Sequence, residues 1–437
     1  MRKAAIVTAC CAMLSACGDS WLGDDGPKPL PGKRISVLSH SKSIEVDVGN
    51  SLRIALPPPE PVADWPQAGG FPGHAMHHLA LTGPVERVWT ARMGSGATKR
   101  GAFMSQPIVV GGKIFALDSE SVLAAFDLKD GDRLWRVDLA PLDADAGSFG
   151  GGVAYDEGRL YVTTGFGQIL AVDPAEGRIL WRQSLLSPAR GAPTVRAGRL
   201  FLVTVDNEAL ALSAEDGHQL WHHAGISEMA ALLGSVSPAV DGNTVLVPYT
   251  SGELFALRME NGTVLWNDLV SSIRRTDQVA ELTDIRGLPV IDRGRVFVAG
   301  NSEIFTAIDL RSGRRVWDRD VGSVETPWVA GDYVYLLSNN AELVCFDGKT
   351  GKARWVTALP RWKNAEEKTG LIIWTGPLLA SDRLILASSS GEVMSVSPYT
   401  GAILSKDDLP AGVTIRPLVA SDTLILVTED GQLVAYR

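Results

Sequence analysis

The sequence contains few cysteines and no cluster of positive charge. Four cysteines occur in 437 residues, and two of them, Cys10 and Cys11, lie in an apolar run near the start. Only Cys17 and Cys345 remain outside that run, which excludes a framework of several disulfides. The chain has 41 basic and 50 acidic residues, which gives a net charge of −9, and the basic residues form no continuous stretch. Because binding to phosphate backbones requires clustered positive charge, we expect no nucleic acid partner.

The first apolar run is too short to cross a membrane as a mature helix. It occupies residues 4–14, directly after Arg2 and Lys3, and leads into the residues LSAC that end at Cys17. This pattern resembles a bacterial lipoprotein signal and predicts a signal peptide over 1–16, with lipidation of Cys17. An ordinary secretory signal cut nearby is the alternative. Loss of the two basic residues leaves 39 basic against 50 acidic side chains, a net charge of −11.

The residues after this signal predict where the protein is held. In lipoproteins that the signal resembles, an aspartate after the lipidated cysteine favours the inner membrane, so Gly18 predicts the outer membrane, facing the periplasm. The following residues are polar and interrupted by proline, as in PKPLPGK at 27–33 and PPPEP at 57–61. We interpret residues 17–60 as a lipidated tether.

The remaining chain, 61–437, is an internal repeat. Each copy begins at an anchor residue, which is proline in seven of the eight copies: Pro107, Val153, Pro193, Pro238, Pro289, Pro327, Pro377 and Pro417. A fixed offset of 28 residues leads from the first seven anchors to Trp135, Trp181, Trp221, Trp266, Trp317, Trp355 and Ser405. A glycine stands four residues before each of these positions. Such a constant spacing inside copies of about 40 to 50 residues indicates a repeat architecture.

Each copy has the pattern of four short strands. Residues 238–266 are divided by DGN, TSG and ENG into runs of strand length, and each break contains a residue that tolerates a positive φ. No helical period is present. Four antiparallel strands in a repeat of this length are typical of one blade of a β-propeller.

The two ends of the repeat predict how the ring closes. After Pro417 the chain reaches Arg437 without a final tryptophan strand, whereas residues 85–93, VERVWTARM, supply one ahead of the first anchor. Pairing of these segments would remove two exposed sheet edges. We therefore predict an all-β, eight-bladed propeller in which an N-terminal strand completes the last blade.

The repeated tryptophans are predicted to lie between neighbouring blades and to bury large rings there. These structural residues are Trp89, Trp135, Trp181, Trp221, Trp266, Trp317 and Trp355. Ser405 has no ring to contribute, so its blade should form the weakest contact with its neighbour.

The motif A-x-D-x-x-x-G-x-x-x-W occurs at 125–135, 171–181 and 307–317. It resembles the tryptophan-docking repeat of quinoprotein propellers. That repeat occurs in pyrroloquinoline quinone dehydrogenases, which are enzymes, and in the BamB family of the outer membrane β-barrel assembly machinery. Many of these enzymes hold the quinone with a disulfide between adjacent cysteines. The adjacent cysteines in this sequence are Cys10 and Cys11, which are lost when the signal peptide is cleaved. No C-x-x-C-H haem motif occurs. The resemblance to BamB, which covers about 61–437 and the lipoprotein signal, is the more specific of the two.

Membership in the BamB family would imply a scaffold without catalytic residues or cofactor. Its partners would be the periplasmic (POTRA) domains of BamA, other assembly subunits and unfolded outer membrane proteins. In that family a leucine-arginine loop before blade four and a D-x-D segment before blade five contact BamA. The matching positions here are Leu232, Leu233, Asp284 and Arg286, of which Leu233 and Arg286 depart from the family pattern. A quinoprotein dehydrogenase and an adaptor for another envelope complex are the alternatives.

Two long connections also predict a partner surface without reference to the family. The joins that follow Trp266 and Trp355 have 22 and 21 residues before the next anchor, against 9 after Trp317. Long loops on a rigid scaffold are common binding elements. Arginine and tryptophan are frequent at the centres of interfaces, which selects Arg274, Arg275 and Trp362.

The histidines do not predict a metal site. His74, His77 and His78 lie close in sequence, but a metal centre needs further ligands and a fixed geometry, and a capping or loop role is the simpler interpretation. No nucleophile elbow G-x-S-x-G occurs either. We therefore assign no metal ligand.

Overall fold

The residues that the computed structural model describes are 44–47, 53–83, 85–96, 105–141, 150–227, 236–270, 284–302 and 304–437. They belong to one compact unit, Ile44–Arg437. The regular structure of these residues is entirely β, and none of them forms a helix that could span a membrane.

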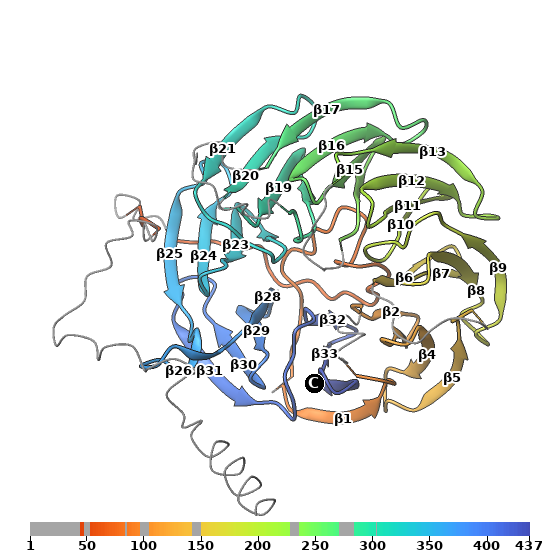
Figure 1. The fold of residues 1–437 in the computed structure, drawn as a ribbon. Helices are drawn as coiled ribbons and strands as arrows, with labels where there is room; N and C mark the ends of the chain where they lie inside the picture. Colours follow the sequence, from red (N-terminus) through yellow and green to blue (C-terminus); the bar gives the residue numbers. More distant parts are fainter. Residues whose placement is uncertain are drawn as a thin grey trace, which may run out of the picture. The chain divides into compact units, whose positions relative to one another are not determined.

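Eight four-stranded antiparallel sheets surround a central axis (Figure 1). The inner strands of blades 1 to 8 are β2 (Ile108–Val110), β6 (Gly151–Asp156), β10 (Thr194–Arg196), β14 (Ala239–Asp241), β18 (Val290–Asp292), β22 (Trp328–Ala330), β28 (Trp374–Ala380) and β32 (Leu418–Ala420). The second strands are β3 (Lys113–Leu117), β7 (Arg159–Thr164), β11 (Arg199–Val203), β15 (Thr244–Pro248), β19 (Arg295–Gly300), β23 (Tyr333–Leu337), β29 (Arg383–Ser388) and β33 (Thr423–Val427).

The outer half of each blade follows the same order. The third strands are β4 (Val122–Asp127), β8 (Gln168–Val172), β12 (Glu208–Ser213), β16 (Glu253–Arg258), β20 (Ile304–Asp309), β24 (Glu342–Asp347), β30 (Glu392–Val396) and β34 (Gln432–Tyr436). The outer strands are β5 (Arg133–Asp138), β9 (Ile179–Ser184), β13 (Gln219–Ala224), β17 (Val264–Leu269), β21 (Arg315–Arg319), β25 (Ala353–Ala358), β31 (Ile403–Asp408) and, for blade 8, β1 (Arg87–Arg92). A separate hairpin pairs β26 (Trp362–Asn364) with β27 (Thr369–Leu371).

Blade 8 is built from both ends of the repeat. Its strand order is β1-β34-β33-β32, and Trp89 of β1 lies opposite Ala435 of β34 in an antiparallel pair. The predicted fold class, an all-β eight-bladed propeller closed by an N-terminal strand, is confirmed.

The repeated motif A-x-D-x-x-x-G-x-x-x-W spans the end of a third strand, a tight turn and the start of an outer strand. In blade 1, Gly131 has a φ of +81° and its N–H donates to the Asp127 carbonyl at 2.9 Å. The Asp127 carboxylate accepts a hydrogen bond from the Lys129 N–H at 2.8 Å. Ala125 and Trp135 are cross-strand partners beside a register shift. The fixed spacing therefore specifies the turn and brings each indole to the same level of its blade.

Seven indoles pack on the turn glycine of the next blade. A Cβ atom added to Gly313 would lie 2.6 Å from Cγ of Trp266, so the close approach of the indole requires a residue without a side chain. The Trp266 Nε1–H donates to the Leu310 carbonyl of the same turn at 2.7 Å. The corresponding pairs are Trp89 with Gly131, Trp135 with Gly177, Trp181 with Gly217, Trp221 with Gly262, Trp317 with Gly351, and Trp355 with Gly401.

The seam between blades 7 and 8 lacks both halves of this contact. Ser405 occupies the tryptophan position of β31, and blade 8 has no turn to receive a ring because its third and outer strands, β34 and β1, are distant in sequence. All six residues of β31 are exposed, whereas the seven other outer strands bury or partly bury their tryptophan.

Residues 60–82, here named the strap, cross the centre of the ring and contact every blade (Figure 1). Trp65 exchanges two backbone hydrogen bonds with Val109 of blade 1, at 2.6 and 2.9 Å, and the Leu79 N–H donates to Leu379 of blade 7. The strap reaches blades 2 to 6 and 8 through Pro66 to Tyr155, Gln67 to Val195, Pro72 to Val240, Gly73 to Ile291, His77 to Trp328, and Val62 to Ser421. It thereby covers inner edges that would otherwise be unpaired.

The chain reaches the strap along blade 6. Val46 bridges Ala353, and the Asp47 carboxylate lies 3.2 Å from the Lys352 ammonium. Further along, Pro57 lies against Gly331. Contacts with the propeller therefore begin before residue 60.

The connections between strands alternate between the two faces of the ring. One face, named the turn face, carries the turns from inner to second strands, such as 111–112, and those from third to outer strands, such as 128–132. The strap runs along this face, since Asp64 accepts a hydrogen bond from the Gly111 N–H. The opposite face, named the crossover face, carries the connections from each outer strand to the next inner strand.

Candidate partner-binding face

Some of the positions that the sequence proposes for partner binding, together with the proposed lipidation site, lie outside the described residues: Cys17, Leu232, Leu233, Arg274 and Arg275. The structure does describe Asp284, Arg286 and Trp362, which lie in connections of the crossover face.

Asp284 lies in the segment that enters blade 5, and its side chain is buried. Its Oδ1 accepts a hydrogen bond from Arg190 Nη2 at 2.9 Å, and the two side chains are 1% and 3% exposed. Arg190 belongs to the segment that enters blade 3, so the pair joins two blades that are not neighbours. Burial lowers the pKa of Arg190, the charge of Asp284 opposes this effect, and Arg286 adds to it. Because removal of one member of a buried pair is costly, the pair fixes these segments.

A second charged pair connects the entries to blades 6, 7 and 8. Arg416 Nε lies 3.9 Å from Oε2 of Glu325, which also accepts hydrogen bonds from the Gly376 N–H at 3.3 Å and the Thr375 hydroxyl at 3.2 Å. Burial raises the pKa of Glu325, while the charges of Arg416 and Arg286 lower it. Polar contacts thus join the entries to blades 3 and 5 in one group, and those to blades 6, 7 and 8 in another.

Trp362 lies on the hairpin formed by β26 and β27, at the rim of the ring (Figure 1). The ring is partly buried, and the Arg361 guanidinium lies 5.7 Å from its centroid. Its cross-strand partner Leu371 is 52% exposed. Neither strand pairs with a further strand within the described ranges. The hairpin therefore presents an aromatic and an aliphatic side chain on the connection that the sequence singled out.

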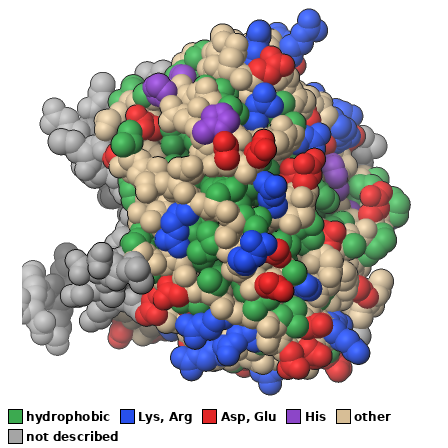
Figure 2. Space-filling model, turned by 90° about the vertical axis from the view of Figure 1, so that its right-hand side faces the viewer, with side chains coloured by type: hydrophobic (Ala, Val, Ile, Leu, Met, Phe, Trp, Pro, Cys, Tyr) green, Lys and Arg blue, Asp and Glu red, His purple; other side chains and the backbone are tan. Residues whose placement is uncertain are grey.

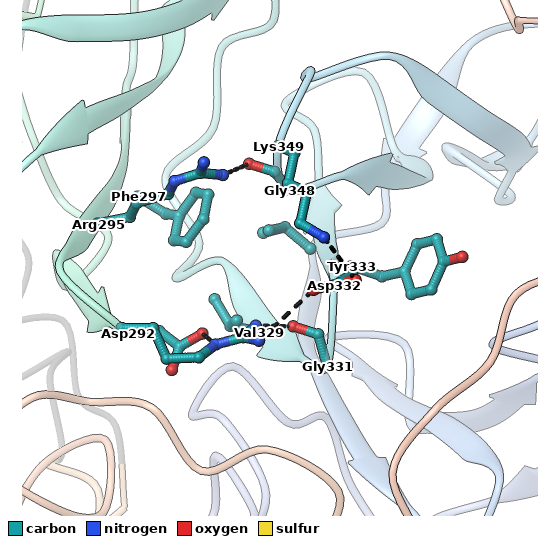
Figure 3. Close-up of a pocket in the computed structure, with 11 residues that line it drawn as sticks. Asp292, Arg295, Phe297, Val329, Gly331, Asp332, Tyr333, Gly348 and Lys349 are labelled. Carbon is teal, nitrogen blue, oxygen red and sulfur yellow. Dashed lines mark hydrogen bonds and ion pairs between the residues drawn. The ribbon is translucent and has the colours of Figure 1, made fainter.

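The turn face has a cavity of about 200 Å³ between blades 5 and 6, with Phe297 and Val329 in its wall (Figure 3). Charged groups surround its mouth, and Arg293 and Arg295 of blade 5 reach acceptors on blade 6. The Lys349 ammonium lies 3.0 Å from the Asp332 carboxylate, and Arg295 donates to the Gly348 carbonyl at 2.8 Å.

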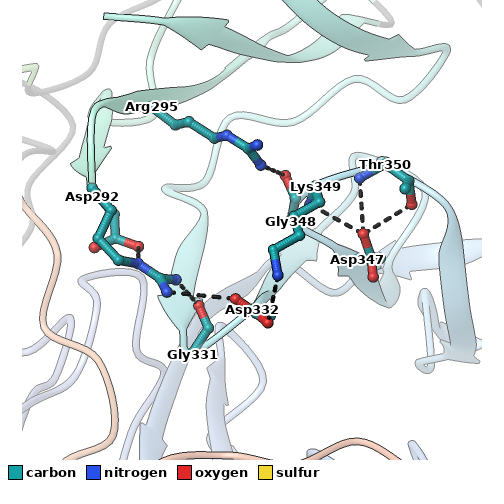
Figure 4. A network of polar contacts seen from close by, with 9 residues as sticks. Asp292, Arg295, Gly331, Asp332, Asp347, Gly348, Lys349 and Thr350 are labelled. Atoms are coloured by element: carbon teal, nitrogen blue, oxygen red, sulfur yellow. Dashed lines mark hydrogen bonds and ion pairs between the residues drawn. The ribbon is translucent and has the colours of Figure 1, made fainter. Parts of the chain in front are cut away.

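The network at this mouth continues to Arg293, which contacts Asp292 on its own blade and Gly331 and Asp332 on the next (Figure 4). The hydrogen bond from Lys349 lowers the pKa of Asp332. Because each cation already faces an acceptor, the arrangement acts as a polar contact between blades and offers no unsatisfied charge to a ligand.

The three histidines of the strap take separate partners. His74 Nδ1 lies 2.8 Å from the Pro289 carbonyl, and His78 Nδ1 lies 2.7 Å from the Pro57 carbonyl. His77 Nε2 is 3.7 Å from Asp292. Burial lowers the pKa of His74 to about 4, so its ring is neutral at pH 7. In the part of the chain that the structure describes, no three His, Cys, Asp or Glu side chains converge as metal ligands would.

The charged pairs of the crossover face were not predicted from the sequence. Arg190, Glu325 and Arg416 each stand within three residues before an anchor proline. That shared position is the signal that could have identified them, since the anchors begin the inner strands and the residues just before them must lie near the axis.

A family model described as outer membrane protein assembly factor BamB matches residues 86–145, 118–357 and 360–437. The chain is 31% identical over 326 residues to the outer membrane protein assembly factor BamB of Escherichia coli strain K12, covering 73% of this chain and 80% of that protein.

Two solved structures show the same fold. The crystal structure of BamB from Moraxella catarrhalis matches with a TM-score of 0.67 at 18% identity, covering 81% of this chain and 99% of that one. A quinohemoprotein alcohol dehydrogenase from Comamonas testosteroni matches with a TM-score of 0.65 at 15% identity, covering 86% of this chain and 80% of that one. At these identities the similarity concerns the fold alone.

Proposed function

We propose a scaffold function for this chain, which belongs to the family of outer membrane protein assembly factor BamB. In this proposal it is a non-enzymatic subunit of the outer membrane β-barrel assembly machinery. Its crossover face binds the periplasmic (POTRA) domains of BamA and holds them, with other subunits, in an arrangement that assists insertion of outer membrane proteins.

The observation that carries the proposal is the construction of the crossover face. The buried pair of Arg190 with Asp284 joins the entries to blades 3 and 5, and the partly buried pair of Glu325 with Arg416 joins those to blades 6 and 8. Rigid support of this kind lowers the entropic cost of ordering loops when a partner binds. Asp284 would act indirectly, by positioning its segment, while Arg286 and the hairpin residue Trp362 are the described candidates for direct contact.

We also propose that the protein is anchored to the outer membrane and faces the periplasm. The signal over residues 1–16 would be removed and Cys17 lipidated, with residues 17–60 as the tether. Val46 and Asp47 contact blade 6 on the turn face, which supports a route for the chain that leaves the crossover face accessible.

The similarity of fold to a quinohemoprotein dehydrogenase makes an oxidoreductase the second candidate. To distinguish an oxidoreductase from a scaffold, pyrroloquinoline quinone and calcium are added to the purified chain, and reduction of a dye is measured with an alcohol as substrate. Reduction above the rate of the boiled protein would favour the enzyme over the scaffold.

The scaffold proposal is tested by crosslinking in membranes followed by purification of the chain and detection of BamA. Trp362→Ser should lower the recovery of BamA severalfold, because an interface aromatic is removed from the crossover face. Phe71→Ser is the matched control, since Phe71 is an exposed aromatic of the strap on the opposite face. Absence of BamA from the unaltered chain, or equal losses in both variants, would contradict the proposal.

A further inference from the structure

The turn face has a second cavity, of about 490 Å³, where the strap passes the inner strands of blades 1 to 3. Its wall includes Pro66 and Phe71 of the strap, Tyr155 and Glu157 of blade 2, and Val195 of blade 3. A space of this size is typical of sites for small molecules. We infer that it binds an organic cation, that is, an ammonium or guanidinium group on an apolar stem.

The walls of this cavity are held in place by contacts within the chain. Gln67 exchanges two hydrogen bonds with the backbone of Val195, both at 2.9 Å. The Tyr155 N–H donates to the Pro66 carbonyl at 2.8 Å, and the Asp64 carboxylate accepts a hydrogen bond from a backbone N–H of blade 1 at 2.8 Å. Because these contacts fix the strap against three blades, a ligand loses little free energy in ordering the walls.

The cavity is acidic, since its lining contains three carboxylates and one guanidinium: Asp64, Asp156, Glu157 and Arg196. Neither Asp156 nor Glu157 forms an ion pair with any residue that the structure describes. Burial raises the pKa of Asp156, the charge of Glu157 raises it further, and the charge of Arg196 opposes both. Since the two carboxylates disfavour each other's charge, a cation beside them would stabilise both charged forms.

The corresponding turn of blade 5 shows how a charge at this position is otherwise satisfied. Glu157 and Arg293 each follow an inner strand, with φ values of +44° and +46°. Arg293 reaches Gly331 and Asp332 on blade 6 and so bridges the mouth of the cavity there. Glu157 has the opposite charge, and no ion pair joins the turns 156–159 and 196–199, which the structure describes in full. The carboxylate on blade 2 is therefore left for a cation from outside the chain.

Aromatic side chains in the same wall favour an organic cation over a metal ion. Phe71 is 46% exposed and Tyr155 is partly buried, and a cation is attracted to the face of such a ring. The rim near β9 mixes charged and apolar side chains over its surface (Figure 2), whereas the cavity brings them together around one space. Within the described ranges no three His, Cys, Asp or Glu side chains converge as metal ligands would. The carboxylates are thus placed around a larger ligand.

The test separates two natural sources of such a cation, a free polyamine and a lysine or arginine side chain of a polypeptide. Isothermal titration calorimetry measures the affinity of the full chain for spermidine, for N-acetylarginine amide and for its uncharged isostere N-acetylcitrulline amide. At least one of the cations should bind about tenfold more tightly than the citrulline compound. The cation that binds more tightly identifies the source.

Two variants test the cavity itself. Glu157→Arg should weaken cation binding about tenfold, because it places a positive charge at the site. It introduces the residue that blade 5 carries at this turn, so the melting temperature should be unchanged. Phe71→Leu should weaken binding severalfold, because it removes the aromatic face and keeps an apolar side chain.

The matched control is Glu176→Arg, which makes the same change of charge at an exposed turn residue of blade 2 outside the cavity. It should leave binding unchanged. Failure of both cations to bind, equal binding of the citrulline compound, or effects of Glu157→Arg and Phe71→Leu no larger than that of Glu176→Arg would overturn the inference. Glu157→Arg should retain the recovery of BamA by crosslinking, because the proposed interface lies on the opposite face, so this inference and the proposed function can fail separately.

Discussion

Two kinds of seam hold this ring together. At seven of them an indole lies on the turn glycine of the next blade, as Trp266 does on Gly313. At the eighth, between blades 7 and 8, neither the indole nor the turn is present, and Ser405 is exposed. The two losses belong together because a tryptophan without a receiving turn would remain in water.

The difference shows that ring closure and seam packing are separate requirements. Blade 8 is completed by hydrogen bonds between β1 and β34, while its contact with blade 7 relies on other groups. The strap supplies some of them, since Leu79 pairs with Leu379 of blade 7 and Val62 with Ser421 of blade 8. Thr82 adds a hydrogen bond to Asp422 at 2.7 Å. The strap thus adds backbone contacts to the side-chain packing between the two blades, in which Ala387 of blade 7 shares a buried cluster with Leu426 of blade 8.

The largest effect should come from removing an indole at an ordinary seam. Trp266→Ala should lower the free energy of unfolding by about 3–5 kcal/mol, because a large buried ring is replaced by a cavity. Thermal unfolding followed by circular dichroism measures the change. Ser405→Ala should shift stability by less than about 0.5 kcal/mol, as for an exposed position. Equal losses in the two variants would refute the distinction between the seams.

The second effect concerns the strap and depends on pH. The pKa of His74 is lowered by burial from 6.5 to about 4, so between these values the unfolded chain binds a proton that the folded chain does not. Stability should therefore fall as the pH drops from 7 to 4, by up to about 3 kcal/mol, and this contribution is complete below pH 4.

His74→Gln provides the comparison for this pH effect, because it keeps a polar side chain of similar size that does not titrate. Melting temperatures of both proteins measured between pH 7 and 4.5 should show a steeper decline for the unaltered chain. Parallel declines would show that His74 does not contribute to the acid sensitivity of the strap.

The smallest of these effects should come from the glycine that receives an indole. Gly313→Ala should cost about 2–3 kcal/mol, because its Cβ would clash with Trp266 in addition to occupying a φ of +69°. Gly294→Ala isolates the backbone cost, since Gly294 has a φ of +73° and open space around its Cα. Urea unfolding of the two variants measures the difference. If Gly294→Ala lowered the free energy of unfolding as much as Gly313→Ala, the clash with the Trp266 indole would not account for the loss.

The sequence was sufficient to predict the ring because its signals are local and repeated. A turn needs its glycine and aspartate at fixed places, as at Gly131 and Asp127, and the indole follows four residues after the glycine. The turn glycine recurs in seven copies, and its absence from the eighth reveals the missing strand, which β1 supplies. The segment before residue 60 has no such signal, because proline-rich stretches have no period.

The strap and the buried charges could not be predicted in the same way. The strap occurs once, and its contacts with eight blades are visible only after the ring has formed. Asp284 was selected as an interface residue, but whether it lies at the surface or pairs with Arg190 depends on segments 94 residues apart. Trp362 was easier to identify as an interface candidate, because it lies in a connection that is longer than those of most other copies of the repeat.

The pairing of β1 with β34 also determines when the protein can finish folding. The strap and β1 are synthesised before any blade, yet each needs partners from the last blade, Ser421 for the strap and Ala435 for β1. Pairing across so long a stretch of chain is slow to form. The strap and β1 are therefore made early but are among the last segments to reach their native positions, and a chain truncated within blade 8 would leave β1 without its sheet.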